Sequence, residues 1–248
     1  MRPVPCNRGR SACGRCKSPP APSGPGPGSA PPYCPIAAIS RRLAPPAAIH
    51  DFRMLRRPRI EFPEAIHHVT MQGVNRSAIF RDDIDRWAFE QLLEAACKKH
   101  RWRCLAYCLM GNQIQLVIKT LAPNLSHGMR FLSSAYLRRH HGRHRASGPL
   151  FQGGYRSLLV HRDAYLLEVV RYVLLNPVRA GLCLSPADWR WSSARAALRL
   201  RPTPTWADFT IIYELLGPLD GQSPQRLQQF LRDGYAEVPG TCPAPLGY

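Results

Sequence analysis

The sequence is poor in acidic residues, in cysteine and in long apolar runs. It has no run of about 18 apolar residues, the length that a membrane-spanning helix needs, and no apolar segment near its N-terminus that would mark a secretory signal. Its nine cysteines are too scattered to indicate a disulfide framework, so we expect a reducing, cytoplasmic location and no membrane partner. No internal repeat is evident. The 248 residues fit one domain with extensions.

Basic residues, in contrast, are abundant. The chain has 34 Lys and Arg against 16 Asp and Glu, which gives a net charge of +18. Nearly all of the basic residues are arginine, so codon usage is one source of the excess. An excess of this size is nevertheless typical of proteins that bind polyanions, because Lys and Arg displace counterions from phosphates. The charge therefore predicts a nucleic acid as partner.

The first 53 residues differ in composition from the rest. They contain almost half of the 25 prolines, together with many Gly, Ser and Ala and no periodic apolar pattern. Such a segment cannot bury enough apolar surface to offset its ordering entropy, so we predict that residues 1–53 form a disordered basic tail. A zinc knuckle around Cys13 and Cys16 is an alternative that the Pro/Gly context disfavours. Another alternative is that translation starts at Met54.

From Ile60 onward the apolar pattern predicts regular elements. Strands are expected over 64–73, 102–110, 113–120 and 150–160, and helices over 82–100, 126–140 and 163–175. The order β-α-β-β-α-β-α predicts an α+β, ferredoxin-like antiparallel sheet with two helices on one face, plus one extra helix. This domain spans 54–182. Helical patterns near 188–199, 206–216 and 223–234 predict a helical C-terminal extension over 183–248.

Several finer features are expected within these elements. Asp82 or Asp83 caps the first helix, and Trp87 lies on its apolar face. A basic loop over 138–145 follows the second helix, and Asn176-Pro177 ends the third.

Five segments, taken in order, resemble one family. They are Arg59–Gly73, Tyr107–Asn112, Leu150–Arg156, Tyr172–Gly181 and Asp188–Ser193. Together they resemble the REP-associated tyrosine transposases, relatives of the insertion-sequence single-tyrosine (HUH) transposases, over about residues 57–200. One such segment is only moderately specific, whereas five in the correct order make a strong match.

The resemblance implies an enzyme of DNA transposition that cleaves and rejoins single-stranded or hairpin DNA. In that family, a His-x-His pair on a strand and a polar residue on a helix hold Mg²⁺ or Mn²⁺, and a helix tyrosine attacks the scissile phosphate to leave a 5′-phosphotyrosine. Tyr172 matches the nucleophile, and Asn176, one helical turn further on, matches the helix-borne ligand. Without the resemblance, Tyr172 would be interpreted as a partly buried helix residue and Asn176 as a helix terminator.

The chain departs from the family at the histidine pair. The family reads Met-Pro-Asn-His-x-His-Leu, and this chain has Gln113 and Gln115 at the two histidine positions. Their spacing places both on one face of a strand, but an amide oxygen is a weaker ligand than imidazole or carboxylate. His67 and His68 on the first strand are alternative ligands, but nothing in the sequence places them at the site, so they are interpreted as ordinary strand histidines.

Three hypotheses remain open. The first is an active transposase that uses Tyr172 and a degenerate metal site of Gln113, Gln115 and Asn176. The second is a catalytically inactive descendant that binds DNA, and the third is an RNA-binding protein that uses the same sheet. A homodimer is also left open.

Basic and aromatic side chains complete the candidate site. The predicted DNA contacts are Lys119, Arg138, Arg139, Arg143, Arg145, Tyr155, Arg156, Arg171 and Arg179. Tyr107, Phe151 and Tyr155 are each candidates to stack on an unpaired base, and core packing is equally open for each.

Overall fold

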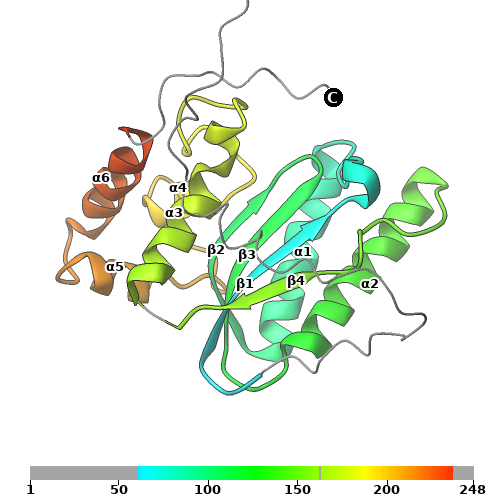
Figure 1. Ribbon diagram of the computed structural model, residues 1–248, viewed down its shortest axis with the longest axis horizontal. Helices are drawn as coiled ribbons and strands as arrows, with labels where there is room; N and C mark the ends of the chain where they lie inside the picture. Colours follow the sequence, from blue (N-terminus) through cyan, green and yellow to red (C-terminus); the bar gives the residue numbers. More distant parts are fainter. Residues whose placement is uncertain (1–60, 162, 237–248) are drawn as a thin grey trace, which may run out of the picture. The chain divides into compact units, whose positions relative to one another are not determined.

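The computed structural model describes residues 61–161 and 163–236 (Figure 1). The predicted tail over 1–53, with Cys13 and Cys16, lies outside the described residues. The elements are β1 (Ala65–Gln72), the short 3-10 helix η2 (Val74–Arg76), α1 (Asp83–His100), β2 (Trp102–Leu109), β3 (Gln113–Thr120), α2 (Leu125–His144), β4 (Arg156–Leu159), α3 (Asp163–Arg179), α4 (Ala194–Ala197), α5 (Thr210–Leu216) and α6 (Ser223–Ala236). In this part of the chain no helix is both long and apolar enough to cross a membrane.

The four strands form one antiparallel sheet in the order β2-β3-β1-β4. Helices α1 and α2 pack together on one face of this sheet, and α3 crosses the other face over β2 and β3 (Figure 1). The α+β, ferredoxin-like class that the sequence predicts is therefore confirmed. The predicted Gly111-Asn112 turn joins β2 to β3, where the Met110 N–H donates to the Gln113 carbonyl at 2.8 Å.

Alternation along β1 divides its side chains between the two faces. Val69 and Met71 are buried toward α1 and α2, while the residues between them are only partly buried on the opposite face. On the covered face Phe89 of α1 and Tyr136 of α2 meet edge to face, with ring centroids 5.2 Å apart. Burial of such side chains contributes about 1.5–3 kcal/mol each. We call these two surfaces the covered face and the open face.

The chain beyond α3 continues along the outer edge of β2. The Leu109 N–H donates to the Trp191 carbonyl at 2.8 Å, and the Cys104 N–H donates to the Trp206 carbonyl at 3.1 Å. Both tryptophans are buried. These contacts satisfy the backbone of an edge strand that would otherwise be open to pairing with another chain.

Two predicted element ends are wrong. Residues 138–145 are no loop, because α2 continues to His144 and ends at Arg145, whose φ of 49° is left-handed. Basic residues suit the C-terminal turn of a helix, where they oppose its dipole. Helix α3 continues through Pro177 to Arg179. Pro177 has no backbone N–H, so the last turn of α3 forms with one hydrogen bond fewer.

Other differences concern α1 and β4. Asp82 caps α1 as predicted, since its side chain accepts from the Asp85 N–H at 3.1 Å. Trp87 differs from the prediction, because it is 52% exposed and does not join the core.

Strand β4 is shorter than predicted. The preceding Gly153 and Gly154 have φ values of 66° and 82°, a left-handed backbone that ends regular pairing.

Candidate functional site

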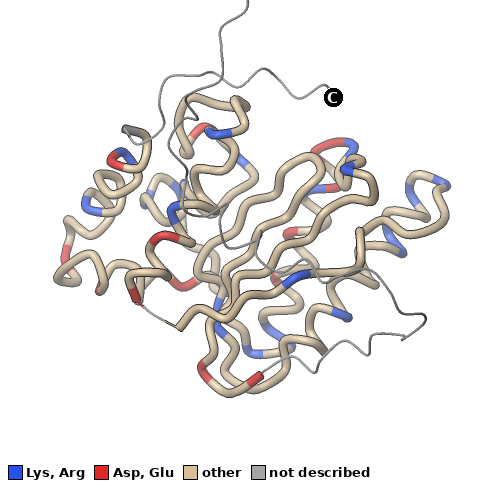
Figure 2. Tube along the Cα trace, in the orientation of Figure 1, with Lys and Arg blue, Asp and Glu red and all other residues tan. Residues whose placement is uncertain are grey.

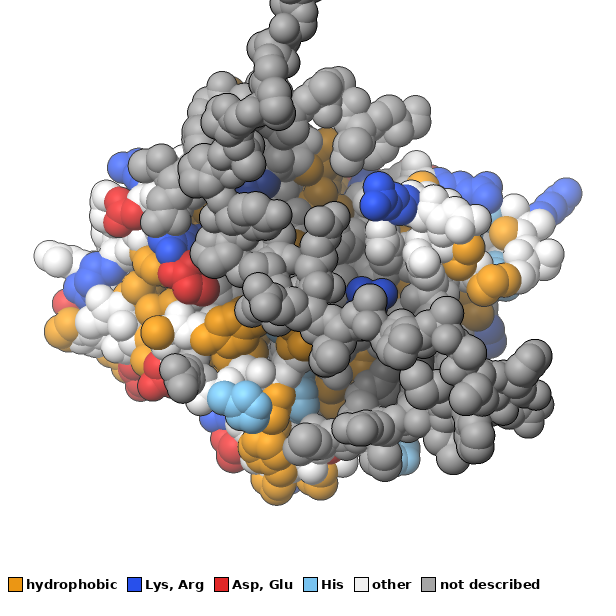
Figure 3. Space-filling view, viewed as in Figure 1, with side chains coloured by type: hydrophobic (Ala, Val, Ile, Leu, Met, Phe, Trp, Pro, Cys, Tyr) orange, Lys and Arg blue, Asp and Glu red, His pale blue; other side chains and the backbone are white. Residues whose placement is uncertain are grey.

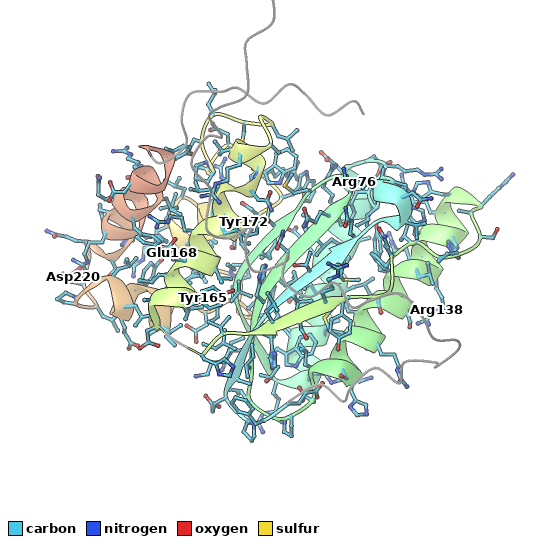
Figure 4. The ribbon with its side chains drawn as sticks, viewed as in Figure 1. Arg76, Arg138, Tyr165, Glu168, Tyr172 and Asp220 are labelled. Carbon is cyan, nitrogen blue, oxygen red and sulfur yellow. The ribbon has the colours of Figure 1, made fainter. Side chains whose placement is uncertain are left out.

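The open face brings together the residues that the sequence selected on β3 and α3. In the β1–β3 register, Thr70 lies opposite Gln115 and Gln72 lies opposite Gln113. Residues that face each other across an antiparallel pair point to the same side of the sheet. Gln113 and Gln115 therefore share the open face, and Figure 4 shows Tyr172 on α3 above the sheet.

A hydrogen-bonded group surrounds Gln115. The Oε1 atom of Gln115 lies 2.6 Å from His68 Nε2 and accepts from Thr70 Oγ1 at 3.3 Å. The Gln115 side chain is almost completely buried, with 1% of the residue exposed. The amide oxygen that occupies the family's imidazole position is thus already used inside the protein.

His68 is a site residue that the sequence reasoning missed. Its ring meets Tyr172 edge to face, with centroids 6.1 Å apart. Burial lowers the pKa of His68, and the hydrogen bond to Gln115 opposes that shift only in part. Its place on the open face follows from its even spacing from Thr70 along β1, but its approach to Gln115 and Tyr172 needs the β1–β3 register. His67, by contrast, is buried toward the covered face.

Tyr172 is presented to solvent on α3. It is 38% exposed, although most neighbouring residues of the helix are buried. The guanidinium of Arg179 lies 5.7 Å from the centre of its ring. A cation over the ring face orients the phenol and adds positive charge where a phosphate would approach.

Asn176 lies one helical turn after Tyr172 and is half-buried. Its Nδ2 atom is buried, and no hydrogen-bond partner for it occurs among the described residues. A buried amide donor without a partner costs free energy unless something else satisfies it. The amide nitrogen is a donor and cannot bind a cation, so this unsatisfied atom does not itself indicate a metal.

A divalent metal does not fit the side chains at Tyr172. The three predicted ligands, Gln113, Gln115 and Asn176, are neutral amides, and the Gln115 oxygen already accepts hydrogen bonds from His68 and Thr70. Mg²⁺ loses its water reluctantly and is normally held by carboxylates and phosphates. Within the described ranges, the group of three His, Cys, Asp or Glu side chains close enough to hold an ion lies elsewhere.

Arg156, Arg179 and Arg76 are basic residues that lie on or beside the open face. Arg156 of β4 is exposed and opposite Thr70, so it shares the face with Gln115. Arg179 lies over Tyr172, as described above. Arg76, which the sequence reasoning did not select, is exposed in η2 just beyond the end of β1 and has a left-handed φ of 61°. Figure 4 shows it at that end of the sheet.

The other predicted DNA contacts lie apart from Tyr172 or are ion-paired. Arg138, Arg139 and Arg145 are exposed at the end of α2. Figure 2 shows basic residues at this end of the helix, and Figure 3 shows basic side chains in the same region. Lys119 pairs with Glu64 at 2.7 Å.

Arg143 and Arg171 also form ion pairs within the protein. Arg143 pairs with Asp82 and Asp85 at 2.5 and 2.6 Å. Arg171 pairs with Glu168 and lies 4.4 Å from the centre of the Phe230 ring. Their part in DNA binding stays a prediction, and these contacts weigh against it.

The aromatic candidates have separate environments. Tyr107 is a core residue with 1% exposed, and its hydroxyl donates to Glu90 at 2.6 Å and accepts from Arg201 at 2.7 Å. Phe151 is half-buried against the core. Tyr155 is also half-buried, with its hydroxyl 3.2 Å from Ser126 Oγ. Tyr107 therefore has no surface to offer a base, which corrects that interpretation.

Comparisons with known proteins agree with this geometry. Residues 62–175 match the family model described as "Transposase IS200 like". Among solved structures, a REP-associated tyrosine transposase bound to a REP hairpin aligns with a TM-score of 0.52 and 14% identity, covering 63% of this chain and 94% of that chain. A tRNA(His) guanylyltransferase from Saccharomyces cerevisiae aligns at 12% identity over 76% of this chain and 88% of that chain, with a TM-score of 0.33 that carries no argument. No curated protein matches the chain.

The fold and the site together define a ferredoxin-like domain that presents a tyrosine over an open sheet face. The segment that matches the IS200-like transposase model contains all four strands and most of α3. The family model and the shared fold together confirm the resemblance to the REP-associated tyrosine transposases. The matched segment includes Gln113, Gln115 and Tyr172 and ends just before Asn176.

Proposed function

We propose that this protein is a transposase-like DNA-binding protein that holds single-stranded or hairpin DNA on the open face without metal-dependent cleavage. The observation that carries the proposal is the hydrogen bond between His68 and Gln115 at 2.6 Å. An internally satisfied amide stands at the position where catalysis in the family needs a metal-binding imidazole. The hairpin bound to the structural neighbour supports the class of nucleic acid.

Each open-face residue has a role in this proposal. Arg156 and Arg179 neutralise phosphates of the bound strand. The exposed ring of Tyr172 stacks on an unpaired base, which duplex DNA does not offer. His68, held by Gln115, fixes the position of that ring from below. Binding by these groups needs no cation.

A second candidate function is cleavage through Tyr172. It is favoured by the exposure of Tyr172 at the position that matches the family's nucleophile. In that reaction the phenol oxygen bonds to phosphorus, the bond from phosphorus to the 3′ oxygen breaks, and the 3′ oxygen takes a proton. Mg²⁺ or Mn²⁺ would be its cofactor by resemblance, and the amide ligands argue against one.

The two candidates separate in one experiment on the full chain. Labelled single-stranded hairpins, the matching duplex and an RNA hairpin are incubated with the protein in Mg²⁺, Mn²⁺ or EDTA. Binding is measured over a range of salt, and covalent adducts are sought on denaturing gels, with Tyr172→Phe as control.

We expect the DNA hairpin to bind more tightly than the duplex, with a steep salt dependence, equal affinity in EDTA and no adduct. A metal-dependent adduct that Tyr172→Phe abolishes would establish the second candidate. Equal affinity for hairpin and duplex would contradict both, and preference for the RNA hairpin would indicate an RNA-binding protein.

A further inference from the structure

A second group of ionisable side chains lies on the covered face, away from Tyr172. Asp85 is in the first turn of α1, and His140 and His144 are one turn apart near the end of α2. Residues four apart on a helix point in the same direction. The two helices pack side by side (Figure 1), and these three side chains meet between them.

The three side chains are close enough to share one ion. One ligand atom from each lies within 4.8 Å of the others. The imidazole rings of His140 and His144 have centroids 4.6 Å apart, and His144 Nε2 lies 2.8 Å from Asp85 Oδ2. Ligand atoms around a tetrahedral Zn²⁺ lie about 3.4 Å apart, so binding asks for side-chain movements of about 1 Å.

His140 gives the strongest sign that something is bound here. It is 4% exposed, and both of its ring nitrogens are buried without a hydrogen-bond partner among the described residues. Its neighbours are rings, with Tyr136 and His144 at centroid distances of 6.1 and 4.6 Å. A buried imidazole with two unsatisfied nitrogens is rare in proteins and needs an explanation.

The surrounding charges are compatible with a cation. The Asp85 carboxylate accepts hydrogen bonds from the Arg81 N–H at 2.9 Å and from Arg143 at 2.6 Å, and it lies 2.8 Å from His144 Nε2. Asp82 adds a second negative charge that also contacts Arg143. These two carboxylates lie near the guanidiniums of Arg143 and Arg81, so a cation would join a group that is close to neutral. The Arg143 and Arg81 contacts also orient Asp85, as partners of metal ligands commonly do.

We propose that Asp85, His140 and His144 bind a divalent transition-metal ion, zinc by ligand type, which joins α1 to α2. Two imidazoles and one carboxylate are a ligand set that suits Zn²⁺ more than Mg²⁺ or Ca²⁺. A water completes the tetrahedron. The role is structural, since neither Tyr172 nor the open face is reached from this side of the sheet. The ion gives His140 the partner that it lacks.

The test compares thermal unfolding of the full chain in EDTA with unfolding in one equivalent of Zn²⁺. We expect Zn²⁺ to raise the midpoint of the unmodified protein. His140→Leu should remove that rise, yet be at least as stable in EDTA because an unsatisfied imidazole has been replaced by an apolar side chain. His144→Gln should also remove the rise. Affinity for Zn²⁺ should fall more than about tenfold in either variant, since even outer partners of a metal ligand contribute that much.

Matched controls separate this site from others in the chain. His127→Gln changes an exposed histidine of the same helix α2 and should keep the full rise. His68→Gln changes the open face and should keep it as well. Titration with Co²⁺ should give a visible spectrum of nitrogen and oxygen ligands without the intense band of cobalt–thiolate bonds.

Three results would overturn the proposal. They are the absence of a Zn²⁺-dependent rise, a rise that survives His140→Leu, and a rise abolished by Cys13→Ser with Cys16→Ser. The last would place the ion on thiolates of the N-terminal segment.

Discussion

The covered and open faces of the sheet carry different kinds of polar side chain. On the covered face, carboxylates, imidazoles and a guanidinium meet between α1 and α2, with Arg143 2.6 Å from Asp85. On the open face, at the position where the family has its metal site, neutral amides meet one histidine, and Gln115 lies 2.6 Å from His68. The charged groups thus lie between the two helices, whereas the open face keeps one imidazole, His68, among neutral amides. The resemblance alone would have predicted a metal site on the open face.

The largest expected effect comes from placing histidines at the two glutamine positions of the open face. Gln113→His with Gln115→His places two imidazoles on that face. We expect affinity for Mn²⁺, measured by calorimetry, to rise at least about tenfold. A covalent adduct with single-stranded hairpin DNA should also appear.

Tyr172→Phe added to this double variant should abolish the adduct. If the double variant binds Mn²⁺ no better than the unmodified protein, then the two glutamines do not occupy the metal position and the comparison of the two faces fails.

A glycine pair tests how tightly the covered face is packed. A Cβ atom at Gly128 of α2 would lie 2.1 Å from a ring carbon of Trp102, whereas one at Gly142 of the same helix would meet nothing within 4 Å. We expect Gly128→Ala to lower the free energy of unfolding by about 1–3 kcal/mol through overpacking. Gly142→Ala should raise it by about 0.5–1 kcal/mol. Urea unfolding measures both, and equal effects would refute the close contact between α2 and β2.

Arginines on the two faces should differ in DNA binding. For Arg156→Gln and Arg179→Gln we expect weaker binding of the hairpin. The slope of log K against log salt should fall by about 0.7–0.9 for each phosphate that the variant no longer neutralises.

Arg143→Gln is the matched change on the covered face. It should lower stability and leave the salt slope unchanged, because its guanidinium already pairs with Asp82 and Asp85. A reduced slope in this variant alone would move the DNA site to the end of α2.

The smallest expected effect is the loss, in acid, of the stability that the Arg143–Asp82 ion pair contributes. The hydrogen bond from Arg143 lowers the pKa of Asp82 from 3.8 to about 2. A carboxyl whose folded-state pKa is depressed contributes stability above its unfolded pKa and loses it as the pH falls through the folded value. The stability difference between the unmodified protein and Arg143→Gln should therefore be full near about pH 5 and shrink between about pH 4 and pH 2. Urea unfolding at several pH values measures it, and a difference that does not change with pH would mean that Arg143 acts through packing alone.

Much of the fold could be predicted because it depends on local patterns. Alternation along β1 and β3, the Gly111-Asn112 turn and the apolar spacing of α1 indicated the elements, and their order indicated the ferredoxin-like plan. The prediction failed where a local signal competes with tertiary contacts. Arg143 and His144 read as a basic loop, but Asp85 of α1 pairs with both and they continue α2. Pro177 read as a helix end, but the helix continues past it.

The candidate site was likewise predictable only where it depends on local spacing. The spacing of Gln113 and Gln115 was enough to place them on one face, and the spacing of Tyr172 and Asn176 was enough to place them one turn apart. The contacts of His68 with Gln115 and Tyr172 were not predictable, because they join three elements that are distant in the chain.

The sequence by itself thus determined the basic charge, the order of the elements, the family resemblance and the replacement of two histidines by glutamines. These are properties of residue types and of their spacing along the chain. Only the tertiary structure decided that His68 satisfies Gln115 beneath Tyr172, and that Asp85, His140 and His144 meet between α1 and α2. Both groups depend on register and helix packing, where residues 47 and 59 positions apart come within hydrogen-bond distance. Such contacts follow from the whole folded core and leave no pattern in any one segment.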